Sequence, residues 1–333
     1  MSKQYVPQHS DKEKVKKKKG SAVSRTANRI FLVISVIVLL VSGSLCVKYI
    51  NDIVKSRKAA EEIANLTAPA FETPDANYGD VVFPDGIQEK YKMAYSINTD
   101  LVGWIKVSNT SIDHPIVKCS DNSYYLRHNF YKDYENRGTA FADYRNNITA
   151  GELDANTIIY GHNNLDSTMF SDLEKYKDIE FYKANPVIQF NTIYHDYNWK
   201  VIAVFLTNAD EKDDNGYVFN YIYPFMYGEN FSQYFDEIAV RSLYSTGVDV
   251  NTDDKILSLS TCTRDMDIRG NGETNARCVV VARMVRDGES AQVDTSLAVK
   301  NDNPRYPQIW YKKNKTTNPY KDAEKWYPKG VIS

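Results

Sequence analysis

An uncharged apolar run near the N-terminus most constrains how this chain can fold. Residues Ile30 to Val47 read IFLVISVIVLLVSGSLCV, eighteen residues without a charged side chain. A helix needs roughly 20 apolar residues to cross the hydrocarbon core of a bilayer. This run and its flanks therefore predict one transmembrane helix at residues 30–50. A buried core helix is a poor alternative beside the four consecutive lysines at 16–19.

The charges on either side of this run indicate its orientation. Residues 1–29 hold nine Lys/Arg against Asp11 and Glu13, whereas the rest of the chain is net acidic. Positive charge stays cytoplasmic, so we expect 1–29 to be a basic cytoplasmic segment and the bulk of the chain to be extracellular. An uncleaved anchor is favoured over a cleaved signal peptide, because Lys48 and Tyr49 follow directly without an A-x-A pattern. Nucleic-acid binding would leave the apolar run unexplained, and we expect no such partner.

The cysteine count favours a free thiol outside the membrane. Cys46 lies in the apolar run, which leaves Cys119, Cys262 and Cys278 in the exported part. An odd number of cysteines in an exported domain indicates an unpaired thiol. Such a thiol is a candidate nucleophile.

Short apolar segments predict a mostly β fold with added helices. Residues 51–85 are expected to be a stalk helix, capped by Asn51 or Asp52, followed by an extended, proline-containing linker. Helical spacing occurs at 87–97, 166–176 and 227–244. Short β-type segments occur at 101–107, 112–118, 157–160, 187–194, 199–207, 256–261 and 278–285. Many short strands with inserted helices favour a β-barrel or sandwich over a parallel α/β sheet.

The apolar periodicity fades after residue 286, although aromatic residues persist. This region is also rich in Lys and Arg. We expect residues 287–333 to be an aromatic and basic tail, either disordered or a surface-binding appendage. The globular domain is then residues 86–286.

Two residues at predicted strand ends carry the chemistry that the sequence favours most. Cys262 follows the run ILSLST, and His162 follows the run TIIYG. The strands on either side of the loop 263–276 are expected to form an antiparallel hairpin, which brings Arg277 to the same end of the sheet as Cys262. A free thiol has a pKa near ~8.5 and needs a nearby imidazole or cation to react at neutral pH. A guanidinium can stabilise the oxyanion of an acyl transfer, so the three residues together predict that reaction.

Other arrangements of reactive residues are less well supported. Cys119 is interpreted as a small buried or edge residue, and Cys278 is expected to point to the opposite face of its strand from Arg277. His114, His128 and Cys119 lack a zinc-ligand spacing. The sequence has neither a Gly-rich phosphate loop nor an HExxH motif. We therefore expect no metal and no cofactor.

A series of motifs resembles, in the same order, those of the class B sortases. The motifs are LVGWIKV (101–107), DNSYYLRHNF (121–130), GTAFADYRN (138–146), IIYGHNNLDSTMFSDLEKY (158–176), LSLSTC (257–262) and RCVVVARM (277–284). The resemblance covers residues 86–286. Its YGH and STC elements contain the histidine and the cysteine chosen above.

The resemblance implies a sortase-type closed β-barrel with an N-terminal helical extension, preceded by the transmembrane helix. It implies a cysteine transpeptidase that cleaves the C-terminal sorting motif of a secreted protein after Thr. Cys262 would form the thioester acyl-enzyme, His162 would be the acid/base partner, and Arg277 would stabilise the oxyanion or the substrate. A peptidoglycan cross-bridge amine, carried on a lipid II type precursor, would resolve the thioester. The enzyme would be a single-pass protein of the cell membrane of a Gram-positive bacterium.

The family's substrate contacts carry over by resemblance to the segments on either side of the predicted strands. The matching positions are Asn122 and Leu126 in DNSYYL, Ser260 in STC, and Tyr217 and Val218 in the loop after residue 207.

This sequence departs from the family pattern in three places. The loop between Cys262 and Arg277 is longer than is usual, so Arg264 and Arg269 also come into question as the arginine. The acidic residue that some members have close behind the cysteine is not matched, because Thr263 and Arg264 intervene. Residues 290–333 have no recognised counterpart.

Two alternative functions remain open from the sequence. One is a pilin-polymerising sortase that uses a lysine as the acceptor amine. The other is a non-catalytic ectodomain that binds the cell wall through its aromatic tail.

Overall fold

The computed structural model describes residues 22–66, 78–268 and 274–329. The chain divides into two compact units, Met1–Lys55 and Ser56–Ser333. Most of the expected basic segment, most of the expected linker and Arg269 lie outside the described residues.

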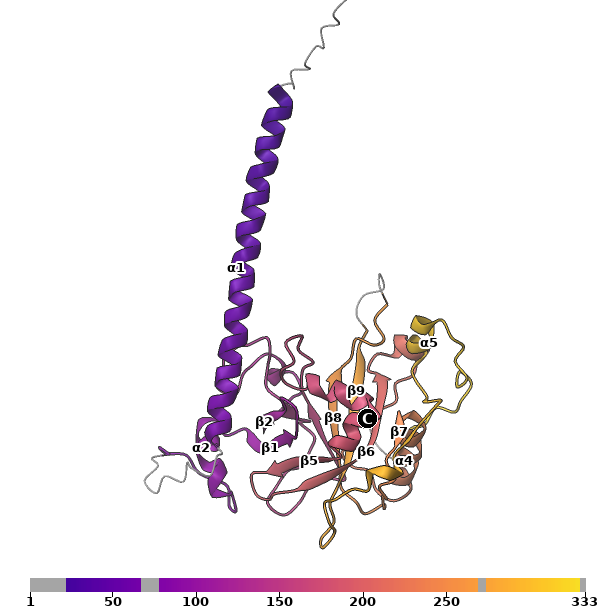
Figure 1. Ribbon diagram of the computed structural model, residues 1–333. Helices are drawn as coiled ribbons and strands as arrows, with labels where there is room; N and C mark the ends of the chain where they lie inside the picture. The colour runs from indigo at the N-terminus through magenta and orange to yellow at the C-terminus, as the bar shows by residue number, and fades with distance from the viewer. Residues whose placement is uncertain (1–21, 67–77, 269–273, 330–333) are drawn as a thin grey trace, which may run out of the picture. The chain divides into compact units, whose positions relative to one another are not determined.

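The N-terminal region forms one continuous helix, α1, at Ala22–Leu66 (Figure 1). Its segment Thr26–Lys55 is long and apolar enough to cross a membrane. The expected start of a separate stalk helix at Asn51 or Asp52 is wrong. Neither Gly nor Pro occurs in residues 44–66, so nothing in the sequence ends the first helix before the stalk.

Eight strands in the described part of the chain close into a β-barrel, as expected from the resemblance (Figure 1). Around the barrel their order is β1-β2-β3-β4-β8-β9-β6-β5. Their bounds are Leu101–Val107 (β1), Asp113–Val117 (β2), Phe141–Ala142 (β3), Asn156–Tyr160 (β4), Val187–Thr192 (β5), Asn198–Asn208 (β6), Ile256–Cys262 (β8) and Ala276–Met284 (β9). The sequence predicted all of these except β3, whose two residues are too few to show a period.

Helices fill the connections between the strands. Helix α2 is Glu89–Ile97 and helix α4 is Glu229–Arg241, close to the expected positions. The helical spacing at 166–176 corresponds to a 3-10 helix, η3, at Ser171–Lys177, which is followed by helix α3 at Ile179–Ala184. The short 3-10 helices η2 and η4 are Tyr124–Leu126 and Glu211–Asp214.

Strand β8 is covered on both of its faces. Leu257 and Leu259 belong to one hydrophobic cluster and Ile256 to a second. A strand that is covered on both faces needs a nearly continuous run of apolar or small residues, which ILSLST provides. Burial ends at Cys262, the exposed last residue of the strand. The reactive thiol predicted from the sequence therefore lies where the strand leaves the core.

The described part of the C-terminal segment, 287–329, contains a short strand and a short helix and contacts other elements of the chain at several places. Strand β10 (Val299–Lys300) pairs with β7 (Tyr244–Ser245), and helix α5 spans Gln308–Asn314. Near its start, Glu289 accepts hydrogen bonds from the fully buried Arg283 of β9. A buried guanidinium needs such a partner, so the segment is anchored where it leaves the barrel.

Candidate active site

The antiparallel pairing of β8 with β9 brings Cys262 and Arg277 together. The register places these two residues directly opposite each other, and Thr261 opposite Cys278. Residues opposite each other in an antiparallel pair project to the same face. Cys262 is exposed, whereas Arg277 is partly buried and donates from Nη1 to the carbonyl of Ala276 at 3.0 Å. The expected hairpin is confirmed, and Cys278 is buried on the opposite face.

Strand β4 brings His162 to the same edge of the barrel. Strands β4 and β8 are parallel, with Tyr160 opposite Ser260. The carboxyl ends of parallel strands meet at one edge of a sheet. His162 follows β4 by two residues and Cys262 follows Ser260 by two, so both leave the sheet at this edge.

Hydrogen bonds on both sides of the histidine fasten its turn to β8. The Gly161 amide donates to the Ser260 carbonyl at 3.2 Å, and the Thr261 hydroxyl donates to the Gly161 carbonyl at 2.8 Å. On the other side, Nδ2 of Asn163 donates to the carbonyl of Cys262 at 2.7 Å. The backbone that carries the imidazole is thus tied to the backbone that carries the thiol.

The glycine before the histidine is required by close packing. A Cβ atom at Gly161 would lie 2.5 Å from Cγ of Phe170, a fully buried ring. The Phe170 amide also donates to the carbonyl of His162 at 3.0 Å. The ring therefore packs directly against the turn and limits where the histidine backbone can lie.

The surroundings of His162 favour its neutral form. Its Nε2 lies 3.0 Å from the carbonyl of Leu126, which can only accept, so Nε2 carries the hydrogen and Nδ1 keeps a lone pair. Burial lowers the pKa of His162, and the positive charges of Arg127 and Arg277 lower it further, although the Leu126 hydrogen bond opposes them. At neutral pH the imidazole is therefore a base with Nδ1 available.

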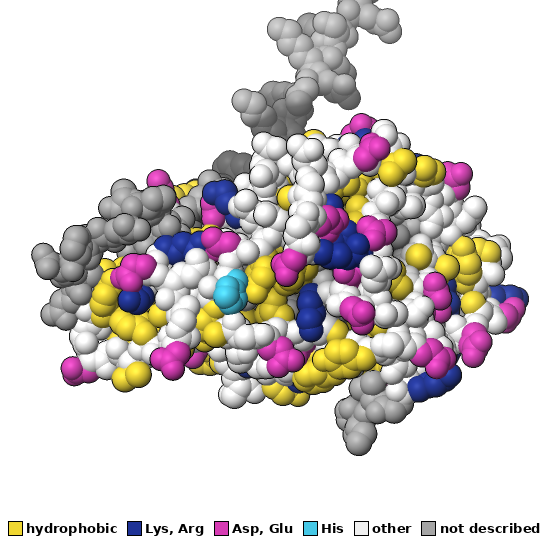
Figure 2. Space-filling model, turned by 90° about the horizontal axis from the view of Figure 1, so that it is seen from below, with side chains coloured by type: hydrophobic (Ala, Val, Ile, Leu, Met, Phe, Trp, Pro, Cys, Tyr) yellow, Lys and Arg dark blue, Asp and Glu magenta, His cyan; other side chains and the backbone are white. Residues whose placement is uncertain are grey.

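All three residues line one cleft of about 510 Å³. Figure 2 shows a face on which a histidine borders a patch of hydrophobic side chains. Four of the five substrate contacts expected from the resemblance also line the cleft: Asn122, Leu126, Val218 and Ser260. The other lining residues are Phe141, Tyr160, Gly161, Asn208, Ala209, Phe219, Asn220, Tyr221, Ile222 and Thr261.

Comparison with known proteins identifies the family to which this arrangement belongs. The family model described as "Sortase domain" matches residues 105–285. "Sortase B" of Listeria monocytogenes is 37% identical over 182 residues, which cover 54% of this chain and 70% of the Listeria protein. The chain belongs to the class B sortases.

Solved structures of the same class agree with the fold. The Staphylococcus aureus sortase B–substrate complex has a TM-score of 0.58 and 29% identity, and the match covers 71% of this chain and 98% of that one. A sortase B complexed with triglycine has a TM-score of 0.56 and 30% identity, over 70% and 98% of the two chains. Sortases are cysteine transpeptidases, and this class B sortase is therefore an enzyme of that type.

Tyr217 is the one expected substrate contact that does not line the cleft of this sortase. Its side chain is buried, and its hydroxyl donates to the carbonyl of Trp326 at 3.2 Å. We therefore leave Tyr217 out of the proposed substrate contacts.

Six aromatic or apolar residues of the cleft were not chosen from the sequence: Phe141, Tyr160, Ala209, Phe219, Tyr221 and Ile222. Tyr160 lies in the YGH motif, and Tyr221 and Ile222 follow the predicted contact Val218 by a few residues. The hydroxyl of Tyr221 lies 2.7 Å from Oγ of Ser260, so the two form one polar group in the cleft. The run YVFNYI at 217–222, which is apolar or aromatic except for Asn220, is the signal that could have indicated this wall.

Asp143, in the motif GTAFADYRN, organises the side of the cleft that holds Asn122. Its carboxylate accepts from Asn122 Nδ2 at 2.9 Å and from the Tyr160 hydroxyl at 2.8 Å. Arg145 forms two hydrogen bonds to the same carboxylate and donates to the Ile222 carbonyl. Burial raises the pKa of Asp143, but hydrogen bonds from Arg145 and Tyr160 outweigh it and lower the pKa overall. A charged Asp143 thus links three lining residues.

Three arginines were candidates for stabilising the oxyanion or the substrate, and the structure distinguishes two of them. Arg277 lines the cleft, whereas Arg264 does not. Arg264 is exposed, and its Nη2 donates to the carbonyl of Asn163 at 3.3 Å. Arg269 lies outside the described residues. Arg277 therefore remains our candidate.

The residues with metal-binding side chains are dispersed in residues 22–66, 78–268 and 274–329. No cluster of three or more His, Cys, Asp or Glu that could hold a metal ion occurs among them. The imidazole of His128 stacks on Tyr124, with ring centroids 3.9 Å apart. Its Nδ1 lies 2.8 Å from the Tyr124 carbonyl.

Proposed function

We propose that this sortase cleaves the C-terminal sorting motif of secreted proteins after Thr and transfers them to a peptidoglycan cross-bridge amine. The observation that supports this most is the meeting of Cys262, His162 and Arg277 at one cleft, from three separate segments. In this proposal Cys262 is the nucleophile and His162 is the general acid and base. Arg277 stabilises the charge that develops on the carbonyl oxygen.

The first half of the proposed reaction makes a thioester. Cys262 passes its proton to Nδ1 of the neutral His162, and its sulfur attacks the threonine carbonyl carbon. The carbonyl electron pair moves to the oxygen, where the Arg277 guanidinium stabilises it. One such interaction is commonly worth about 3–4 kcal/mol in the transition state. The imidazolium then protonates the departing amine as the peptide C–N bond breaks.

The second half transfers the acyl group to an amine. A related sortase B is described as complexed with triglycine, which supports a glycine-type amine on a lipid II type precursor as the acceptor here. As the amine attacks the thioester, His162 takes one of its protons. That proton returns to the sulfur of Cys262 when the C–S bond breaks. A lysine amine of a pilin would react in the same way and is the second candidate acceptor.

The walls of the cleft are proposed to hold the sorting motif. Leu126 and Val218 offer apolar surface at the cleft, and Ser260 with its tyrosine partner offers a polar group. Asn122 already donates to Asp143 and accepts from the Tyr144 amide, so it has one N–H left for a substrate carbonyl.

We also propose that Thr26–Lys55 anchors the enzyme in the cell membrane, with the N-terminus inside and the barrel outside. The uncharged run and the preceding basic residues support this orientation. Protease added to intact cells should release the barrel into the medium. Complete protection of the barrel would refute the orientation, and a mature chain that begins beyond the apolar run would show a cleaved signal sequence.

The central test is Cys262→Ala. Wild-type enzyme should cleave threonine-containing sorting peptides and join them to triglycine, whereas the variant should form neither product. Cys119→Ala is the matched control, because Cys119 does not line the cleft and its thiol donates to the Asp121 carbonyl. Wild-type rates in Cys262→Ala would contradict the proposal. If wild-type enzyme cleaves nothing but sediments with peptidoglycan, the wall-binding alternative is favoured.

A further inference from the structure

The loop 209–228, which we call the cleft loop, forms one wall of the active-site cleft. It joins β6 to α4. Six of its residues line the cleft: Ala209, Val218, Phe219, Asn220, Tyr221 and Ile222. No strand of the barrel lies within the loop, all of which is described. Something other than a strand ladder must therefore hold this wall in place.

Two buried asparagine side chains hold the cleft loop against the barrel. Nδ2 of Asn156 donates to the carbonyls of Tyr221 and Tyr223, at 3.1 and 3.2 Å. Nδ2 of Asn208 donates to the carbonyl of Tyr217 at 2.8 Å. These amides satisfy carbonyl groups that a neighbouring strand would otherwise satisfy.

The C-terminal tail, 287–329, also packs against the cleft loop. The ring of Trp326 lies 6.0 Å from that of Phe219 and 6.3 Å from that of Tyr223, between centroids. It lies 6.1 Å from Tyr234 of α4, and its Nε1 donates to Oε1 of Gln233 at 3.1 Å. The indole thus joins the cleft loop, α4 and the tail in one aromatic cluster.

Further contacts fix the tail along the cleft loop. The Tyr217 hydroxyl donates to the Trp326 carbonyl at 3.2 Å, and its ring packs edge-on against Tyr327, with centroids 5.7 Å apart. Nearer the start of the loop, Oδ1 of Asp214 accepts from the Gln308 amide at 2.8 Å. The tail therefore contacts the cleft loop at Asp214 and again at Tyr217.

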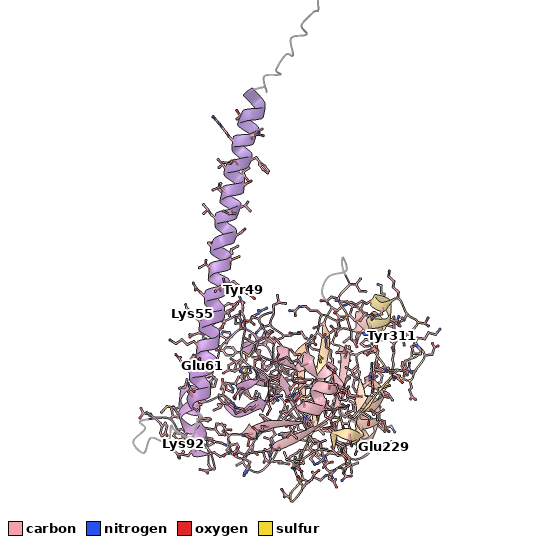
Figure 3. All side chains as sticks on the ribbon, viewed as in Figure 1. Tyr49, Lys55, Glu61, Lys92, Glu229 and Tyr311 are labelled. Atoms are coloured by element: carbon pink, nitrogen blue, oxygen red, sulfur yellow. The ribbon has the colours of Figure 1, made fainter. Side chains whose placement is uncertain are left out.

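The end of the described tail is fastened to the first turn of α4. Asn230 exchanges two hydrogen bonds with the backbone of Lys329, at 2.8 and 2.9 Å. Nζ of Lys329 lies 3.2 Å from Oε1 of Glu229, which begins α4 and is labelled in Figure 3. The tail is thus fixed at Gln308, before Trp326 in the sequence, and at Lys329, after it.

We propose that the tail is a brace that holds the cleft loop in position for the sorting peptide, with Trp326 as its main positioning residue. The proposal rests on the proposed function, in which the cleft loop contacts substrate. The family model ends at residue 285, so the brace lies beyond the matched sortase domain. A wall that is already ordered before binding loses less conformational freedom when the peptide arrives, and affinity is higher for that reason.

The position of Trp326 determines which kinetic parameter should change. Trp326 does not line the cleft, and its contacts are with the cleft loop and α4 rather than with Cys262, His162 or Arg277. Removing its ring should therefore weaken peptide binding and leave the chemical step largely intact.

The test compares Trp326→Ala with Trp310→Ala in the full-length chain. Trp310 is a matched control in the same tail, because it stacks on Tyr306 and packs near Met266, and none of the three lines the cleft. Trp326→Ala should raise KM for the sorting peptide about tenfold, which corresponds to about 1.4 kcal/mol, with kcat changed less than about twofold. Trp310→Ala should leave KM close to the wild-type value.

Two further measurements separate positioning from general damage. Hydrogen exchange of the amides in the cleft loop should accelerate in Trp326→Ala, while exchange in β8 stays at the wild-type rate. The rate of alkylation of Cys262 by iodoacetamide should not change. Trp326→Phe keeps an aromatic ring but loses the bond to Gln233, so it should recover most of the affinity, and it serves as the main variant if Trp326→Ala does not fold.

The outcomes of these measurements are distinct. Unchanged exchange and unchanged KM in Trp326→Ala would overturn the brace. A fall in kcat with faster exchange in β8 would overturn it too, since the tail would then support the whole barrel. If wild-type enzyme cleaves no sorting peptide, the proposed function fails, yet exchange in the cleft loop still decides whether the tail orders it.

Discussion

The two sides of the active-site cleft are built in different ways. The reactive side consists of the ends of β4, β8 and β9, where backbone hydrogen bonds between paired strands fix Cys262 opposite Arg277. A second side is the cleft loop, which is held by asparagine side chains and by Trp326 of the tail. Strand pairing holds Cys262 and Arg277, and hydrogen bonds to β8 hold the turn that carries His162, whereas a few side chains hold the other side. We expect substitutions on the two sides to affect different kinetic parameters.

On the reactive side, Arg277→Ala should have the largest effect on catalysis after the loss of Cys262 itself. Loss of a group that stabilises an oxyanion should lower kcat about 10²–10³-fold. Steady-state kinetics with a fluorogenic sorting peptide measure this change. Arg264→Ala is the control, because Arg264 does not line the cleft. A larger loss in Arg264→Ala than in Arg277→Ala would reverse the assignment of the arginine.

Gly161→Ala tests how closely the histidine turn is packed. The new methyl group would lie 2.5 Å from the buried ring of Phe170, and such overpacking typically costs about 1–3 kcal/mol. Denaturant unfolding should show that loss together with reduced kcat, since the turn carries His162. Gly151→Ala is the matched control, because a Cβ at Gly151 meets nothing within 4 Å. Equal behaviour of the two variants would show that the turn tolerates displacement.

On the other side, Asn156→Ala should weaken the hold on the cleft loop. It removes both amide hydrogen bonds to the loop and the hydrogen bond that Asn156 accepts from Ser258, at a cost of about 1–3 kcal/mol. KM should rise about fivefold, and kcat should change less. Asn185→Ala is the control, since Asn185 is also buried but bonds to Phe181 and Asn109, away from the loop. A drop in kcat without a change in KM would contradict the division between the two sides.

The smallest expected effect is a shift in the pH dependence of kcat/KM. Burial lowers the pKa of His162, and Arg127 lowers it further, so Arg127→Gln should raise it. In the proposed mechanism the neutral imidazole is the base. The value of kcat/KM should then fall as the pH drops through this pKa, and the acid limb should move upward by a few tenths of a pH unit in the variant. High salt should reduce the difference in the acid limb between Arg127→Gln and wild-type enzyme. Arg264→Gln should leave the limb in place, and an opposite shift in Arg127→Gln would exclude the neutral imidazole as the base.

The reactive side could be predicted from the sequence because it depends on short-range rules. Runs such as ILSLST and TIIYG identify strands, and the residues after them lie at strand ends. The hairpin rule then brings Arg277 back to Cys262. The resemblance supplied the roles of these residues and the closed barrel, which periodicity alone left open between a barrel and a sandwich.

The cleft loop could not be predicted in this way. Tyr217 was chosen and Tyr221 was missed, because the direction in which each residue of a loop points depends on what packs against it. The tail, 287–329, supplies that packing through Trp326, and its weak apolar periodicity gave no sign of an ordered structure.

The sequence by itself determined the apolar segment that is long enough to cross a membrane, the strands that lead to Cys262 and His162, and the return of Arg277 by a hairpin. These features follow from hydrophobic length, from periodicity and from pairing across a single loop. Only the tertiary structure decided that β4 lies beside β8, that the cleft loop lines the same cleft as the thiol, and that Trp326 packs against this loop. Those contacts join segments far apart in the chain, and their formation depends on which surfaces fit together in three dimensions.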